Sequence, residues 1–228
     1  AGLIAGIWIG IIFIRNGYNL GRNYKTYTVA GFVMPAIMAG LFLLLIIPLE
    51  LSTGAPYFSQ KGPGAMHPAV WISLVFGLLI GIAAQQSRFC TMGALRDVIL
   101  IKDFHLMTGV TGFLLGSFVC NIIFDQFSPG FTGQPVAHTD YIWNFLGMAL
   151  AGLAFVLAGG CPGRQLFLSG EGDGDAAVFV LGMITGAGFA HNFSIASSPA
   201  GTGQLGPLFV IIGLAVCVAI GLTMRKKM

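Results

Sequence analysis

The sequence has few charged residues: Asp, Glu, Lys and Arg make up 8% of its 228 residues, whereas soluble domains contain about 25%. Apolar residues account for 56%, and the mean hydropathy is +0.86. Water does not keep so apolar a surface dispersed, whereas the hydrocarbon of a bilayer favours it. The composition therefore excludes a soluble domain and predicts an all-α integral membrane protein.

Other familiar signals are also missing. The four cysteines include no Cys-x-x-Cys pair, which argues against a disulfide framework and against a thioredoxin-type redox pair. The acidic run at 171–175 lacks the ligand spacing of a calcium loop, and we expect neither a metal nor another cofactor. No signal peptide is visible, and the chain opens at Ala1 inside an apolar run. We therefore expect an amino-terminal part of a longer protein to precede it.

Six or seven apolar stretches are long enough, or nearly so, to cross about 30 Å of hydrocarbon as helices. A further helix, too short to span, is expected between Cys90 and Lys102. Most of the 34 glycines are expected to serve close helix packing. The sequence thus predicts a polytopic helical bundle in a single membrane domain, 1–228. The stretches are 2–14, 28–49, 69–86, 106–124, 141–159, 176–191 and 205–224.

The basic residues support this map. If the stretches alternate in direction, Lys61 is the only one of the 11 Lys and Arg residues on its side of the membrane. The segments 125–140 and 192–204 contain neither Lys nor Arg. Because positive residues accumulate in cytoplasmic loops, we place the carboxyl terminus in the cytoplasm. The net charge of +3 needs no nucleic acid to explain it.

Two cysteines lie in similar frames at the ends of apolar stretches. Their surroundings read Ser-Arg-Phe-Cys-Thr-Met-Gly at 87–93 and Gly-Gly-Cys-Pro-Gly-Arg at 159–164. Trp71 precedes Cys90 by 19 residues, and Trp143 precedes Cys161 by 18. The spacing predicts an internal repeat with units of about 66–130 and 138–205. Such repeats are typical of transporters, whose substrate sites form where the repeats meet and the helices are broken or re-entrant.

The residue types in these frames suit an anion. We expect non-helical breaks at 87–90 and 159–163, and a helix that restarts after a break exposes N–H groups and partial positive charge. Pro162 suits a first helical turn because it has no N–H to leave unpaired. A thiol is a weak donor towards a soft sulfur or selenium atom. The candidate binding or relay residues are Cys90, Cys161, Arg88, Thr91, Arg96 and Arg164.

Structural roles are the alternative for several residues. Snorkelling or topology alone would account for Arg88 and Arg164 at the ends of spans. Arg96 beside Asp97 is also consistent with a plain ion pair. An acidic residue at 173 or 175 is expected to cap the next helix. Packing roles are expected for the two remaining cysteines, Cys120 and Cys217.

The runs 88–97 and 159–165 together resemble the YeeE/YedE membrane protein family, and 168–176 resembles its selenium-metabolism-associated YedE branch. The resemblance implies two pseudo-symmetric halves in an hourglass-shaped bundle of a bacterial inner membrane. It also implies uptake of a sulfur anion such as thiosulfate, or of a selenium compound, in contact with the thiols of Cys90 and Cys161. Only one set of motifs is present, so the chain is expected to be the carboxyl-terminal half of a longer transporter or to pair with a partner subunit. A TusA-type sulfur-carrier protein is an expected partner.

Three interpretations follow. We expect a permease, not an enzyme, that passes a small sulfur- or selenium-containing anion inward through weak contacts of about 1 kcal/mol each. The alternative is a membrane thiol enzyme that handles persulfide or disulfide sulfur at Cys90 or Cys161. The lack of a Cys-x-x-Cys pair and of a general base near Cys161 argues against it. A purely structural subunit would leave the paired motifs unexplained.

Overall fold

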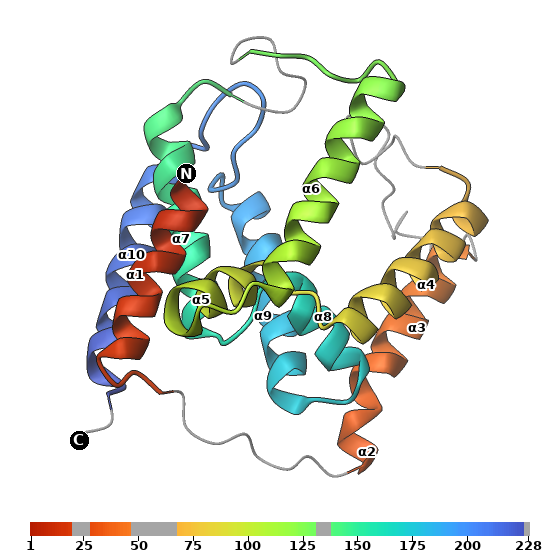
Figure 1. Cartoon of the computed structure of the whole chain (residues 1–228), viewed down its shortest axis with the longest axis horizontal. Coiled ribbons are helices and arrows are strands. Elements are labelled where there is room, and N and C mark those ends of the chain that lie inside the picture. Colours follow the sequence, from red (N-terminus) through yellow and green to blue (C-terminus); the bar gives the residue numbers. More distant parts are fainter. Residues whose placement is uncertain (20–27, 47–67, 131–137, 226–228) are drawn as a thin grey trace.

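The structure is a computed structural model that describes residues 1–19, 28–46, 68–130 and 138–225. Within these ranges the regular elements are helices, without strands (Figure 1). The helices are α1 (Gly2–Arg15), α2 (Thr28–Gly31), α3 (Val33–Ile46), α4 (Val70–Ser87), α5 (Thr91–Ile101), α6 (His105–Ile123), α7 (Tyr141–Leu157), α8 (Pro162–Gly170), α9 (Gly174–Asn192) and α10 (Gly206–Thr223).

Among the described residues, five helical segments are long and apolar enough to cross a membrane: Val70–Ile101, His105–Ile123, Tyr141–Gly170, Gly174–Asn192 and Gly206–Thr223. The predicted all-α, polytopic architecture is confirmed, as is the short helix after Cys90, which is α5. One stretch differs from expectation. The helix predicted at 28–49 is interrupted at Phe32, between α2 and α3, and its last three residues lie outside the described ranges.

The elements around the two cysteines follow the same order. A long helix (α4 or α7) ends just before a cysteine, a short helix begins directly after it, and a second long helix follows. The short helices are α5, of 11 residues, and α8, of 9. Both second long helices, α6 and α9, have 19 residues. The sets α4–α5–α6 and α7–α8–α9 therefore have the same order of elements.

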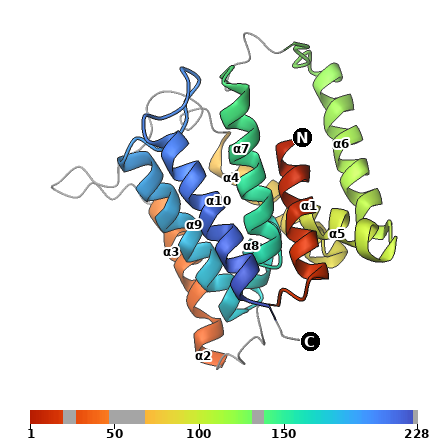
Figure 2. The same ribbon diagram turned by 90° about the vertical axis from the view of Figure 1, so that its left-hand side faces the viewer.

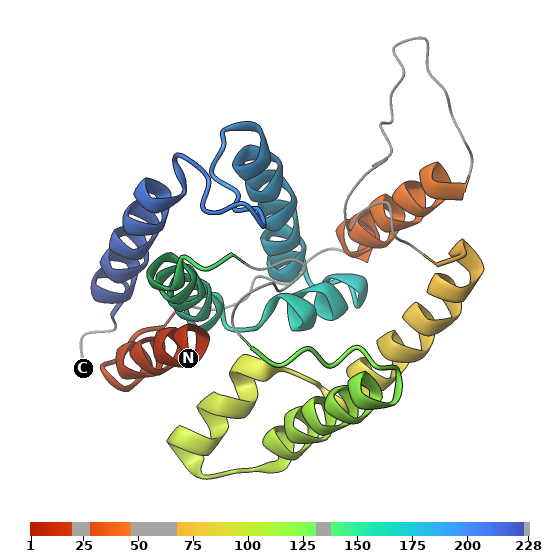
Figure 3. The same cartoon turned by 90° about the horizontal axis from the view of Figure 1, so that it is seen from above.

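The tightest packing joins α1 to α7, with α10 on the other side of α7 (Figures 2 and 3). Glycines at 2, 6 and 10 place one face of α1 against α7. A Cβ added to Gly6 would overlap the carbonyl oxygen of Ala149, and one added to Gly152 would overlap that of Leu3. Small residues let two backbones approach this closely, as in many membrane helix pairs. Residues of both helices, Ile7 and Ile11 of α1 and Val156 of α7, share a buried cluster with Cys161.

Helices α4 and α6 are much less covered. Among the residues of α4, Ala84 alone is buried, and α6 has no buried residue. Large apolar side chains such as Trp71, Phe76 and Phe113 are exposed along them. Glycines of the two helices, at 77, 81, 112 and 116, have no neighbouring atom within 4 Å of an added Cβ. This apolar surface suits hydrocarbon or further helices.

Candidate functional site

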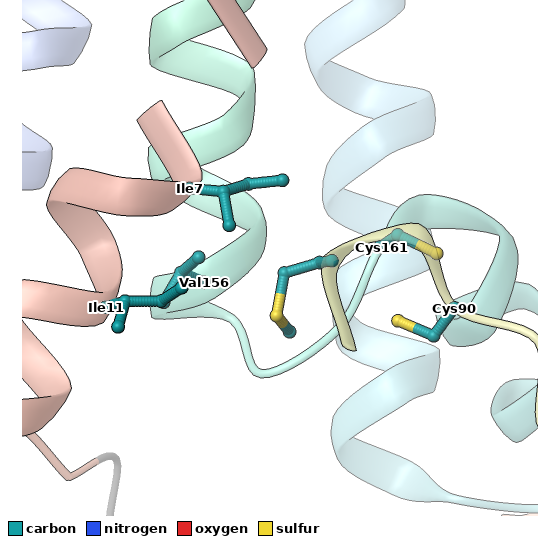
Figure 4. Packing of buried hydrophobic residues seen from close by; sticks show 6 residues of the cluster. Ile7, Ile11, Cys90, Val156 and Cys161 are labelled. Carbon is teal, nitrogen blue, oxygen red and sulfur yellow. The ribbon is translucent and has the colours of Figure 1, made fainter. Parts of the chain in front are cut away.

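The structure brings Cys90 and Cys161 together. Each is the residue that precedes a short helix, α5 and α8 respectively. They belong to one buried cluster, in which they expose 7% and 5% of their surface (Figure 4). Their thiols lie within hydrogen-bonding reach of each other. The remaining members of the cluster are apolar: Ile7, Ile11, Met92 and Val156.

The first break is a left-handed turn at the end of α4. Arg88 has a φ of 53°, and the N–H of Phe89 donates to the carbonyl of Ala84 at 3.1 Å. This is the 6→1 bond of a Schellman turn, which pairs a carbonyl that the end of a helix would otherwise leave free. The Cys90 sulfur then caps α5 by accepting the N–H of Gly93 at 3.2 Å.

The second break repeats this geometry. Gly159, also two residues before its cysteine, has a φ of 78°. The N–H of Gly160 donates to the carbonyl of Phe155 at 3.0 Å. The expected break at 159–163 is too long, because α8 resumes at Pro162, whose missing N–H suits a first helical position. Likewise Ser87, expected in the first break, is the last residue of α4.

Two residues that the sequence analysis did not single out pair two carbonyls at the end of α7. The Tyr18 hydroxyl donates to the Leu157 carbonyl at 2.8 Å. The Gln165 side-chain amide donates to the Ala158 carbonyl at 3.2 Å. Unpaired carbonyls at this depth would each cost several kcal/mol. Gln165 had a visible signal, since it is an amide inside an apolar run, whereas Tyr18 had none.

The other candidate residues lie at different distances from the pair. Thr91, at the start of α5, lies against the Cys161 thiol. Arg164 occupies the first turn of α8, where its Nη1 is buried and has no hydrogen-bond partner among the described residues. Its nearest acid is Glu171, with Nη1 and Oε1 3.9 Å apart. Arg88 is exposed. Arg96 is tied to the neighbouring acid, Asp97, by a contact of 2.8 Å between Nε and Oδ1.

The remaining cysteines lie elsewhere. Cys120 is exposed on α6. Cys217, on α10, packs against a second cluster that contains Phe13, Tyr18 and Leu153.

In the part of the chain that the structure describes, no three His, Cys, Asp or Glu side chains gather as metal ligands would. The site is thus a pair of thiols at two helix starts, which no described His, Asp or Glu joins in a group of three.

Both breaks lie in a part of the chain that is similar to known proteins. The family described as sulphur transport matches residues 86–226, which include both breaks. The chain is 32% identical over 103 residues to the thiosulfate transporter TsuA of Spirochaeta thermophila, covering 45% of this chain and 31% of that protein. It is 27% identical over 108 residues to TsuA of Escherichia coli, covering 47% and 30%. The match therefore spans about a third of the length of these relatives. No solved structure matches the chain.

Proposed function

Because the chain belongs to the sulphur transport family, we propose that it carries part of the pathway by which a small sulfur anion, such as thiosulfate, crosses a membrane. Its family and its five long apolar helices make it a multi-pass membrane protein. The observation that carries the proposal is the meeting of two broken helices at one buried pair of thiols, Cys90 and Cys161. The two relatives, both thiosulfate transporters, supply the substrate class.

The geometry suits weak, successive contacts with an anion. Helices α5 and α8 both begin at the thiols, so their N-terminal partial charges favour a negative group there. The S–H groups of Cys90 and Cys161 are weak donors towards the polarizable terminal sulfur of thiosulfate. Each such contact contributes about 1 kcal/mol, weak enough for the anion to leave. In this proposal the two thiols relay the anion without forming a covalent bond.

Arg164 supplies the attracting charge. Its Nη1 is buried and lacks a hydrogen bond, and Glu171 is too distant, at 3.9 Å, to satisfy that atom fully. A buried guanidinium nitrogen in this state favours an incoming anion. Arg88 stands exposed at the first break and acts at longer range in this proposal, whereas Arg96 is already neutralised by its acidic neighbour.

Several finer features belong to the proposal as well. The charge distribution along the chain favours a cytoplasmic carboxyl terminus in a bacterial inner membrane. The uncovered apolar faces of α4 and α6 favour further helices, from a longer chain or a partner subunit, around the thiol pair. A selenium anion and a TusA-type sulfur carrier are the corresponding alternative substrate and partner.

The thiol-enzyme alternative draws on the closeness of the two sulfurs, which would permit exchange of a persulfide or disulfide. Such chemistry needs a group that activates the thiol. Among the described residues, no His, Asp or Glu joins Cys90 and Cys161 in a group of three. Transport is therefore the function that the site favours.

The test is uptake of labelled thiosulfate, and separately of labelled selenite, by cells that lack their own uptake system and produce the full-length protein. We expect thiosulfate to enter, and Cys90→Ala or Cys161→Ala to remove most of the flux. Cys120→Ala and Cys217→Ala are matched controls because neither thiol belongs to the pair. Absence of thiosulfate flux from correctly inserted protein would refute the proposed substrate, and selenite flux alone would replace it.

A further inference from the structure

Buried polar side chains are rare in this chain. Among the described residues that are classed as buried, Gln165 and Ser169 are the polar ones, with exposures of 7% and 2%. Both lie on α8. Ser169 donates to the Leu166 carbonyl of its own helix at 2.8 Å. Gln165 instead reaches back across the break to the Ala158 carbonyl. A buried amide with a partner outside its own helix calls for a specific reason, because burying it costs free energy unless it is hydrogen-bonded.

The reason lies in the carbonyls at the end of α7. Those of Phe155 and Val156 accept the N–H groups of the Schellman turn, and that of Leu157 accepts the Tyr18 hydroxyl. The next carbonyl, that of Ala158, belongs to the residue that follows α7. It accepts a hydrogen bond from the Gln165 side-chain amide at 3.2 Å.

Gln165 therefore holds the chain on both sides of Cys161. Its side chain binds the Ala158 carbonyl before the cysteine, and its backbone N–H donates to the carbonyl of Cys161 itself at 3.0 Å. Gly160, in the loop between Ala158 and Cys161, also lies close to the Gln165 side-chain amide. A Cβ added to Gly160 would lie 2.9 Å from the Gln165 Nε2. Two hydrogen bonds, one from the side chain and one from the backbone of Gln165, thus join it to the segment 158–161.

The first break has no comparable side-chain contact across it, because its cysteine is held in another way. The position four residues after Cys90 is Ala94, which has no polar side chain. There the sulfur is oriented by its own cap bond to the N–H of Gly93. Cys161 makes no side-chain cap bond with its helix, and its thiol lies against Thr91 and Cys90 of the other unit, so the loop that carries it has to hold it in that place.

We propose that Gln165 is a positioning residue that holds the second break in the shape that points the Cys161 thiol at Cys90. This role rests on the proposed function of the thiol pair, because a relay needs the two sulfurs to face each other. The carbonyl bond acts on the loop and not on the passing anion. Its loss should therefore free Cys161 while leaving Cys90, capped by its own helix, in place.

The test compares Gln165→Met, which keeps the length of the side chain but removes the donor, with the matched control Ser169→Ala on the same helix. In membranes containing the full-length protein, the rates at which N-ethylmaleimide alkylates Cys90 and Cys161 are followed by mass spectrometry. We expect Gln165→Met to accelerate alkylation of Cys161 about tenfold, the factor expected from losing one buried hydrogen bond. Cys90 should stay within about twofold, and Ser169→Ala should change neither rate.

An unchanged alkylation rate at Cys161 would overturn the inference. An equal rise in rate at both cysteines would also overturn it, because it would indicate that the whole site has become more accessible. If Gln165→Met does not insert, Gly160→Ala tests the same contact from the loop side. With Gln165 present, the added methyl should displace the amide and accelerate alkylation of Cys161. In a Gln165→Ala background, where no amide lies against the methyl, Gly160→Ala should change the alkylation rate no further. Alkylation needs no transport, so a wild-type protein without thiosulfate flux would refute the proposed function and leave this test intact.

Discussion

Substituting one atom at Cys161 separates a hydrogen-bonding relay from covalent thiol chemistry. The side chain is 5% exposed and lies against the Cys90 thiol. Cys161→Ser keeps a small donor there but abolishes persulfide and disulfide formation. Cys161→Ala removes the donor from a buried polar contact, which costs about 1 to 3 kcal/mol, or roughly tenfold to a hundredfold in occupancy by the anion. Initial rates of labelled thiosulfate uptake, normalised to inserted protein, should therefore rank wild type, then Ser, then Ala.

The same comparison at Cys90 should run in the same direction, although Cys90→Ala also removes the cap of α5. Cys120→Ala and Cys217→Ala should each keep nearly the wild-type rate, because these side chains lie outside the pair. Equal and complete loss of uptake with Ser and with Ala at Cys161 would refute the relay. The covalent interpretation would then replace it.

Three further predictions test the scaffold. Gly6→Leu should separate α1 from α7, because even a Cβ at this position overlaps the Ala149 carbonyl; a wild-type elution profile in detergent would contradict the packing. Tyr18→Phe should lower thermal stability in detergent by about 1 to 3 kcal/mol, since it leaves the Leu157 carbonyl unpaired; an unchanged melting temperature would show that the bond contributes nothing. Asp173→Ala should cost about 0.5 to 2 kcal/mol by removing the cap of α9, and Asp173→Asn should recover most of that stability.

The spans and the breaks could be predicted from the sequence because both depend on local features. The length of an apolar run fixes whether a helix can cross hydrocarbon, and Gly159 and Pro162 mark a helix end and a helix start. The cap of α9 followed from the same reasoning, since Asp173 was one of two expected caps and its carboxylate accepts the N–H of Ala176 at 2.8 Å. The breaks are shorter than expected because Pro162 begins a helix at once.

Long-range contacts could not be predicted. The hydrogen bond from Tyr18 to Leu157 joins residues 139 positions apart, and no sequence feature near either residue predicts it. Close packing was expected of most glycines, but it is confirmed for the glycines of α1 and not for those at 77 and 81 in α4, which face open space. A glycine in an apolar run indicates that a close approach is allowed, not which helix makes it. The orientation of Arg164 likewise depends on tertiary structure, because its burial arises from the helices around α8.

The most direct test of the central claim, that a sulfur anion passes between the two thiols, is protection of both from alkylation. The full-length protein in membranes is treated with N-ethylmaleimide, with thiosulfate or with an equal concentration of sulfate, which lacks the soft terminal sulfur. We predict that thiosulfate slows modification of Cys90 and of Cys161 together, that sulfate protects much less, and that Cys120, exposed on α6, reacts at the same rate throughout. Equal modification of the pair with and without thiosulfate, in protein that transports it, would contradict the claim.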